Sequence, residues 1–234
     1  MKTVPVIAID GPTASGKGTI AQQVARALRF QYLDSGALYR LVALRALQSH
    51  VDEEPDRLAL IAAQIKPQFA QGRIVLDGVD VSDALRSEEV GRVASQIAVF
   101  GGVRAALVEL QRSSRRLPGL VADGRDMGTV VFPDARPKIY LTASVEARAE
   151  RRYKQLIEKG FSASISPFST EQISLEAVRR EIQARDQRDA QRAVSPLKPA
   201  SDAYQIDSSQ LTVEEVVAQV LKWYELSQEQ AAGN

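Results

Sequence analysis

The stretch GPTASGKGT, residues Gly11–Thr19, decides which fold this chain can form. A short apolar run, VPVIAID, comes before it, and apolar residues at helical spacing come after it. The spacing GxxxxGK between a strand and a helix is typical of a loop whose backbone N–H groups bind phosphates. The helix that begins there adds the positive end of its dipole. We therefore predict that Gly11–Thr19 wraps a polyphosphate and that Lys17 bridges its terminal phosphates.

The residue after the lysine is Gly18, where this motif usually has Ser or Thr, and a hydroxyl comes only at Thr19. Motor and signalling nucleotidases use the usual hydroxyl as a direct magnesium ligand. GKGT is instead the form of small-molecule kinases of the nucleoside monophosphate type, in which substrate phosphates and water hold most of the magnesium. The only asparagine is Asn234, so the chain has no NKxD motif and a signalling GTPase is disfavoured.

The chain has 234 residues, no cysteine and one histidine, His50. Disulfides, thiolate zinc sites and cysteine nucleophiles are therefore excluded, and histidines cannot form a metal cluster. A serine–histidine triad would need His50 beside a serine, and we expect His50 to be a surface residue after a helix instead. The net charge of +1 argues against nucleic acid as a partner.

The N-terminal apolar run is too short for a signal sequence and is interrupted by Asp10. No segment approaches the roughly 20 apolar residues of a membrane span. We therefore expect a cytoplasmic protein without a membrane partner. Nothing in the sequence marks an obligate interface, and we expect a monomer.

Five apolar runs have the character of strands and alternate with helical patterns, which favours an α/β fold with a parallel sheet covered by helices on both faces. Ligands of such sheets bind outside the carboxyl ends of the strands. Acidic and glycine residues follow several of the runs, so we expect them to converge on one site. The runs are Val4–Ile9, Gln31–Leu33, Leu120–Ala122, Lys138–Thr142 and Tyr204–Ile206.

Two segments break this alternation. Phe69–Val81, FAQGRIVLDGVDV, has turn signals at Gln71-Gly72 and Asp77-Gly78 and predicts two antiparallel hairpins. We expect an insert over 65–86 that closes over substrate; a decorative hairpin is the alternative. The serine-rich stretch 160–174 lies between two arginine-bearing helices and is expected to be a mobile lid loop. The predicted core is 1–64, 87–150 and 190–234, with the lid over 151–189.

The end of the second predicted strand suits a second phosphate-bearing substrate. Ser35 and Gly36 open a helix whose backbone N–H groups can receive a phosphate, and Arg40 lies about one turn further on. A helix cap and a surface arginine are the alternative explanation.

The end of the third predicted strand, VADGRDMGTVVFPDA, residues 121–135, is dense in charge. Asp123, Arg125 and Asp126 crowd a glycine-flanked turn at the edge where ligands are expected. We predict that this turn is functional rather than only structural and that Asp123 orients magnesium-bound water.

Two predicted helices carry arginines on one face. A solvated, salt-bridged face is the ordinary explanation for such helices. Because both helices flank the serine-rich loop beside a phosphate site, we favour a role in neutralising a transferring phosphoryl group and excluding water. The residues are Arg148, Arg151 and Arg152 at i, i+3 and i+4, and Arg185, Arg188, Asp189 and Arg192 at i, i+3, i+4 and i+7.

Taken together, these motifs resemble those of the bacterial cytidylate kinases. The resemblance runs from about Val4 to Ile206. DGRDMGTVVFPDA and RDxxDxxRA are far more specific than the phosphate loop. It rests on GPTASGKGT, LDSGALYR, DVSDALRSEEV, ASQIA, ADGRDMGTVVFPDA and RDxxDxxRAVSPL, in this order and spacing.

The resemblance implies a P-loop kinase with a five-stranded parallel sheet, a small antiparallel β insert that helps to bind the nucleoside monophosphate, and a lid. It implies transfer of the γ-phosphoryl group of ATP to CMP or dCMP, with Mg²⁺ held by the substrate phosphates and water rather than directly by the protein.

The resemblance also implies roles at matching positions. The expected catalytic residues are Lys17, Asp123, Arg125 and Arg185. The expected ATP-binding residues are Gly11, Pro12, Thr13, Ala14, Ser15, Gly16, Lys17, Gly18, Thr19, Arg148, Arg151 and Arg152. The expected CMP-binding residues are Ser35, Gly36, Arg40, Ser95, Arg104, Arg125, Asp126, Arg185, Asp189 and Arg192. Among the latter, Ser95, Arg104, Asp126 and Arg192 resemble the cytosine-reading set, and Arg185 and Asp189 the residues that meet the sugar.

One segment departs from the family pattern, because 160–185 is longer than in common members. Two alternatives also stay open from the residues themselves. One is a P-loop kinase for another small acceptor, such as UMP, shikimate or gluconate. The other is a regulatory module that binds ATP and changes shape without turnover.

Overall fold

The computed structural model describes residues 4–70, 72–158 and 174–232. The chain divides into two compact units, and each is treated by itself below. Unit 1 joins Met1–Tyr32 to Leu117–Asn234, and unit 2 is Leu33–Arg116.

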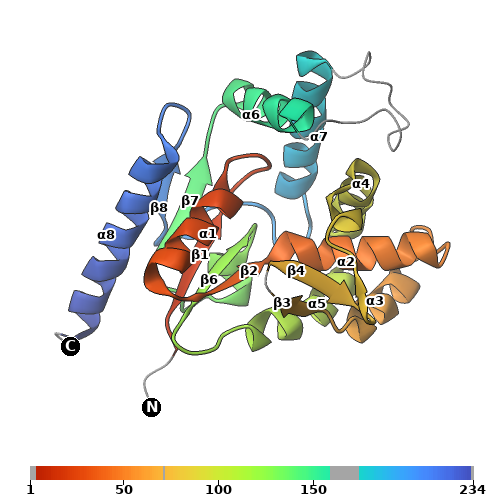
Figure 1. Cartoon of the computed structure of the whole chain (residues 1–234), viewed down its shortest axis with the longest axis horizontal. Coiled ribbons are helices and arrows are strands. Elements are labelled where there is room, and N and C mark those ends of the chain that lie inside the picture. Colours follow the sequence, from red (N-terminus) through yellow and green to blue (C-terminus); the bar gives the residue numbers. More distant parts are fainter. Residues whose placement is uncertain (1–3, 71, 159–173, 233–234) are drawn as a thin grey trace. The chain divides into compact units, whose positions relative to one another are not determined.

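Strands and helices alternate from β1 to α2, and helical segments separate the later strands β6, β7 and β8 (Figure 1). The strands are β1 (Val6–Asp10), β2 (Gln31–Asp34), β3 (Gln68–Ala70), β4 (Arg73–Leu76), β5 (Val79–Asp80), β6 (Leu120–Gly124), β7 (Lys138–Thr142) and β8 (Tyr204–Asp207). The α-helices are α1 (Lys17–Leu28), α2 (Ser35–Gln48), α3 (Pro55–Gln64), α4 (Glu88–Ile97), α5 (Gly101–Ser113), α6 (Val145–Glu158), α7 (Leu175–Ala190) and α8 (Val213–Ala232). A 3₁₀ turn, η1 (Ala84–Arg86), and a π-helix, η2 (Met127–Val131), complete the set.

The central sheet has five strands in the order β2-β6-β1-β7-β8. This confirms the predicted five-stranded parallel sheet, and each of the five predicted runs overlaps one of its strands. The central strand β1 is parallel to β6 on one side and to β7 on the other. In this register Asp10 lies opposite Gly124, so β1 and β6 end level with each other, and opposite Tyr140, two residues before the end of β7.

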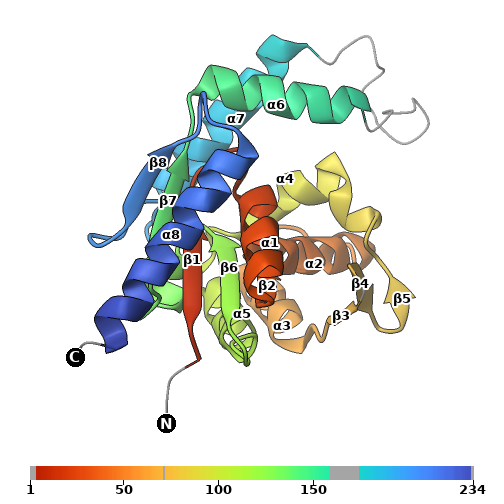
Figure 2. The same ribbon diagram turned by 60° about the vertical axis from the view of Figure 1, so that its left-hand side comes forward.

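The helices α1 and α8 pack against the same core as the sheet (Figures 1 and 2). Ile20 and Val24 of α1 and Val216 and Val220 of α8 are buried against apolar side chains of β1, β6, β7 and β8. Burial of such side chains stabilises the fold by about 1.5–3 kcal/mol each. The rings of Tyr204 and Trp223 stack at a centroid distance of 4.3 Å and fix α8 to the edge strand β8.

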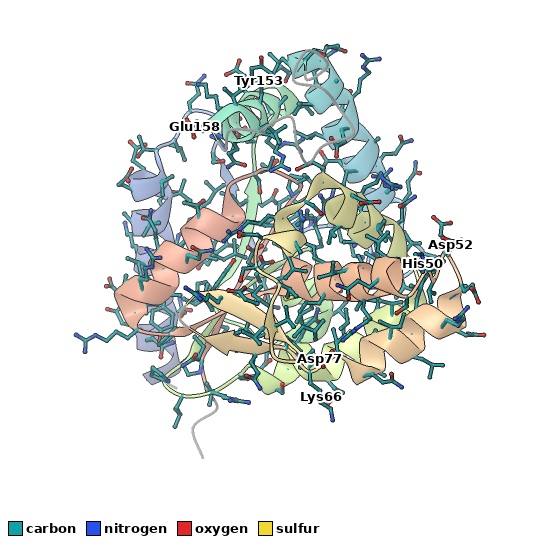
Figure 3. The ribbon with its side chains drawn as sticks, turned by 45° about the vertical axis from the view of Figure 1, so that its right-hand side comes forward. His50, Asp52, Lys66, Asp77, Tyr153 and Glu158 are labelled. Carbon is teal, nitrogen blue, oxygen red and sulfur yellow. The ribbon has the colours of Figure 1, made fainter. Side chains whose placement is uncertain are left out.

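Unit 2 contains the predicted antiparallel insert. Its three strands have the order β3-β4-β5, and both pairings are antiparallel (Figure 2). The turn between β4 and β5 needs positive φ at both central residues, and Asp77 and Gly78 have φ of 50° and 81°. Asp77, labelled in Figure 3, forms an ion pair with Arg45 of α2, which ties this turn to a helix.

His50 is exposed just after the end of α2, as the sequence predicts (Figure 3). The sequence does not predict the π-helix η2, which begins directly after the charged turn. The helix α7 ends at Ala190, so Arg192 does not belong to it. The predicted lid loop 160–174 lies outside the described residues except for Ser174, which caps α7 by accepting the N–H of Ala177 at 3.1 Å.

Among the described residues, no single helix has the length and apolar character to cross a membrane. The two helices α4 and α5 meet that test only as a pair, and the chain bends by 105° between them.

Candidate active site

The phosphate loop joins β1 to α1, and its shape depends on two glycines. Gly16 precedes α1 with φ of 91°, a left-handed conformation that favours glycine. At Gly11 a side chain is excluded for a different reason, since its Cβ would lie 2.0 Å from the carbonyl oxygen of Leu141. The backbone can therefore curve between the strand and the helix as the motif predicts.

Lys17 is the first residue of α1 and is only 8% exposed. Its Nζ donates to the carbonyl of Pro12, at the start of the loop, at 3.0 Å. Burial and, to a smaller extent, the positive charge of Arg125 lower the pKa of Lys17 to about 7, while Asp123 acts in the opposite direction. An anionic phosphate beside this amine would favour its charged form.

Asp123 explains why glycine suits the position after the lysine. A Cβ on Gly18 would lie 3.1 Å from Oδ2 of Asp123. The same carboxylate oxygen accepts the hydroxyl of Tyr32 at 3.1 Å. The loop thus replaces the usual hydroxyl side chain by space for a buried carboxylate at the end of β6.

Arg125 follows β6 and reaches the phosphate loop from the other side. Its Nη2 donates to the hydroxyl of Thr13 at 3.0 Å, and its Nε donates to Asp189 of α7 at 2.7 Å. Asp189 also pairs with Arg192, just beyond the end of α7. Burial would raise the pKa of Asp189, but Arg125 and Arg192 hold that pKa below its usual value.

The arginines of α6 also face the loop. Arg148 is buried and donates to the carbonyl of Thr13 at 3.0 Å and to Asp186 of α7. Arg151 donates to Ser208, which follows β8, and its Nη1 lies 3.5 Å from the carbonyl of Ser15. Arg152 is half-buried on α6, and Arg185 is half-buried on α7, close enough to Lys17 to lower its pKa.

Unit 2 holds the other predicted acceptor residues. Ser35 is buried at the start of α2 and Gly36, next to it, is exposed. Arg40 donates to the carbonyl of Leu85 at 2.7 Å. Arg104 donates to the carbonyl of Ala98 at 3.2 Å.

Ser95, on α4 of unit 2, has an unusual environment. It is 3% exposed, and its hydroxyl has no hydrogen-bond partner among the described residues. A buried polar group without a partner is costly, so this hydroxyl is a candidate contact for a bound molecule.

All four predicted catalytic residues, Lys17, Asp123, Arg125 and Arg185, belong to unit 1. So do the predicted ATP-binding residues, and Thr13 and Ser15 directly receive contacts from the arginines. The predicted CMP-binding residues are divided between the units: Ser35, Gly36, Arg40, Ser95 and Arg104 belong to unit 2, and Arg125, Asp126, Arg185, Asp189 and Arg192 to unit 1.

The sequence does not single out two residues that contact this site. Asp186 accepts the backbone N–H of Thr13, and Ser208 donates to the carbonyl of Ser15 at 3.3 Å. Asp186 lies inside the RDxxD motif and Ser208 directly follows a strand of the parallel sheet, and these positions are the signals that could have identified them. Asp10, one of the acidic residues at strand ends that are expected to converge on one site, accepts the backbone N–H of Met127.

Within the part of the chain that the structure describes, no three acidic, histidine or cysteine side chains converge to hold a metal ion. Asp123 is nevertheless a hard oxygen donor beside the lysine of the phosphate loop. This donor set suits Mg²⁺ that is bound chiefly by substrate phosphates and water.

Comparison with known proteins agrees with the motifs. The family model for cytidylate kinase matches residues 7–226. A cytidylate kinase from Ralstonia pickettii is 58% identical over 221 residues, which are 94% of this chain and 91% of the relative. A cytidylate kinase from Cupriavidus necator is 56% identical over 225 residues, which are 96% of this chain and 97% of the relative.

Among solved structures, a gluconokinase from Sinorhizobium meliloti is 14% identical with a TM-score of 0.48, and the match covers 100% of this chain and 99% of that one. The identification of the family rests on the sequence relatives instead. Since the family model spans nearly the whole chain and the relatives match along almost their full length, this protein belongs to the cytidylate kinase family.

Proposed function

We propose that this protein transfers the γ-phosphoryl group of MgATP to CMP or dCMP and releases ADP with CDP or dCDP. The proposal rests on family membership, and on one structural observation above the others. The side chains of Lys17 in α1, Arg125 in the turn after β6 and Arg148 in α6 all bond to the phosphate loop. Such a concentration of cations suits a polyphosphate whose negative charge moves during the reaction.

The chemistry needs positioning and charge neutralisation rather than a covalent residue. Backbone N–H groups of Gly11–Thr19 bind the β- and γ-phosphates, and Lys17 follows the transferring group. Arg125 stabilises the phosphoryl group between donor and acceptor, with Arg185 beside it. Arg148, Arg151 and Arg152 neutralise the donor phosphates.

Magnesium fits this scheme through the substrates. The phosphates and water would hold the ion, and Asp123 would orient one of those waters. When bound, Mg²⁺ would supply positive charge that offsets the negative charge of the phosphates. The protein's own contribution is to place Asp123 against the space that Gly18 leaves open, close enough to Lys17 to act on the pKa of its amine.

On the acceptor side, Ser35, Gly36 and Arg40 would hold the CMP phosphate, and Arg185 and Asp189 the sugar. Ser95, Arg104, Asp126 and Arg192 would read the cytosine. The buried hydroxyl of Ser95 supports this assignment, because a base could supply the hydrogen bond that it lacks among the described residues.

We also propose the division into core, monophosphate-binding insert over 65–86 and lid over 151–189, and a monomeric enzyme of the cytoplasm that serves pyrimidine nucleotide metabolism. ADP release with CMP, dCMP, UMP, AMP, shikimate and gluconate as acceptors tests the activity. Rapid turnover with CMP and dCMP alone is expected. ATP binding without turnover on any acceptor would favour the regulatory module, and turnover on shikimate or gluconate would contradict the proposed acceptor.

A further inference from the structure

Asp10 is a buried carboxylate that none of the roles above uses. It is the last residue of β1, is 5% exposed, and directly precedes Gly11 of the phosphate loop. Its Oδ1 accepts the backbone N–H of Met127 at 2.8 Å, and its Oδ2 accepts the backbone N–H of Gly128 at 2.8 Å. Both oxygens of one side chain therefore hold two consecutive backbone groups of another segment.

These bonds complete the N-terminus of η2. The first N–H groups of a helix have no partner within the helix and need an acceptor from elsewhere. The carbonyl of Asp126 already receives the N–H groups of Val130 and Val131. Asp10 supplies the missing acceptors for the first two residues of η2, although it is 117 positions away from Met127.

The turn before η2 is fixed at both ends by the same residue. Asp10 lies opposite Gly124 in the parallel pairing of β1 with β6, and its carboxylate holds Met127 and Gly128. Only Arg125 and Asp126 stand between these two anchors. Arg125 reaches from this turn to the hydroxyl of Thr13 in the phosphate loop.

We propose that Asp10 is a positioning residue for phosphoryl transfer, which sets the place of Arg125 and Asp126 relative to the phosphate loop. The inference rests on the proposed function, because it takes both residues to act on the substrates. Asp10 touches neither substrate in this scheme. Asp10 acts on both segments because it directly precedes the loop at Gly11 and its carboxylate binds the backbone that follows the turn at 125–126.

The charge of Asp10 matters to this role. An ionised carboxylate can accept both N–H groups, whereas a protonated one turns one acceptor into a donor. Burial raises the pKa of Asp10 to about 6; the two backbone hydrogen bonds oppose the rise, Asp126 adds to it and Lys17 opposes it. The other charged or titratable groups nearby are Tyr140, whose pKa Asp10 helps to raise, and Lys138, whose side chain lies against Gly128.

The substitution Asp10→Asn tests the proposal. The amide keeps the shape of the side chain but presents an N–H to one of the two backbone N–H groups. Displacement of the turn should lower kcat with CMP on the order of 10²-fold. The preference for CMP over UMP should narrow at the same time, which a merely destabilised but correctly folded enzyme would not show.

Asp207→Asn is the matched control. Asp207 ends β8 of the same sheet, and its carboxylate accepts the backbone N–H of Ser209 at 2.9 Å, but it is exposed. This variant should retain kcat and the ratio of CMP to UMP efficiency. If Asp10→Asn also retains both, the proposal is overturned, while an inactive wild type would instead refute the proposed function.

If the Asp10→Asn protein does not fold, a second measurement on the wild type tests the proposal. In the ligand-free wild type, the Cγ resonance of Asp10 and the amide resonances of Met127 and Gly128 should titrate together by NMR, with one midpoint near the pKa of about 6. If the amide resonances of Met127 and Gly128 do not change with the same midpoint as the Asp10 carboxyl group, Asp10 does not hold these amides and the proposal is overturned.

Discussion

The carboxylate of Asp186 accepts the backbone N–H of Thr13 at 3.2 Å, so α7 contacts the phosphate loop directly. The other oxygen of Asp186 pairs with Arg148 of α6, which donates in turn to the carbonyl of Thr13 at 3.0 Å. One ion pair therefore holds both polar backbone groups of a single loop residue. It also joins the two helices that flank the predicted lid loop.

The first prediction concerns the energy of this ion pair. Asp186→Ala leaves Arg148, which is buried, without its carboxylate partner. Removal of one member of a buried pair is strongly destabilising, and we expect a loss of about 3 kcal/mol in the free energy of unfolding. Urea denaturation measures it as a lower midpoint.

The control for this experiment lies on the same two helices. Glu146 of α6 and Arg179 of α7 form an exposed pair at 3.9 Å. Glu146→Ala should change the free energy of unfolding by less than about 1 kcal/mol. Equal losses in the two variants would show that Asp186 is no more than a surface charge.

The second prediction follows from the lowered pKa of Lys17. With a pKa of about 7, most Lys17 amines are neutral at pH 8 in the free protein. A polyphosphate beside the amine raises its pKa, so binding of ATP takes up a proton at pH 8 and much less near pH 6. Titration calorimetry in buffers of different ionisation enthalpy measures this uptake.

Lys17→Met should abolish the proton uptake while the protein stays folded, and it should remove most activity because a point charge on the transferring group is lost. Charge stabilisers of this kind lower the barrier by about 2.7–4 kcal/mol. Binding heats of the wild type that do not depend on the buffer at pH 8 would show that Lys17 is already charged.

The third prediction concerns the space beside Gly18. In Gly18→Ala the new Cβ would lie 3.1 Å from Oδ2 of Asp123, so the carboxylate must shift. Because Asp123 is proposed to orient a magnesium-bound water, the Mg²⁺ concentration for half-maximal rate should rise on the order of tenfold. Gly101→Ala is the control, since a Cβ there meets nothing within 4 Å. If Gly18→Ala needs the same Mg²⁺ concentration as the wild type, Asp123 does not orient a magnesium-bound water.

The fourth prediction concerns base choice. The ionised carboxylate of Asp126 only accepts hydrogen bonds, so it suits the exocyclic amine of cytosine and not O4 of uracil. Asp126→Ala should therefore lower the efficiency with CMP far more than with UMP. Arg40→Ala, at the proposed phosphate contact, should lower both efficiencies about equally. If Asp126→Ala preserves the ratio of the efficiencies with CMP and UMP, Asp126 does not recognise the base, and that role would fall to Ser95 or the arginines.

Much of the fold could be predicted because its signals are local. The loop Gly11–Thr19 specifies a strand, a tight turn and a helix within a short stretch, and the structure has all three. The turn at Asp77-Gly78 likewise needs only two residues that tolerate positive φ. Alternating strands and helices then favour the parallel sheet that is observed.

The rest depends on partners that are distant in the sequence. The π-helix η2 begins where it does because Asp10 accepts its first N–H groups from another strand, which no local pattern of 127–131 encodes. Arg148 and Asp186 lie 38 positions apart in sequence, and their direct ion pair, like the contact of each with Thr13, follows from the packing of α6 on α7. Arg192 continues the helical spacing of α7 in sequence, yet the helix ends at Ala190.

Transfer of labelled phosphate tests the central claim most directly. Wild-type protein is incubated with Mg²⁺, ATP labelled in the γ-phosphoryl group, and an equimolar mixture of CMP and UMP, and the labelled products are separated. We predict that the label appears in CDP, with one CDP formed for each ADP and little label in UDP. The claim of phosphoryl transfer to CMP would be contradicted if the label appeared in inorganic phosphate or chiefly in UDP. It would also be contradicted if ATP bound but no label were transferred.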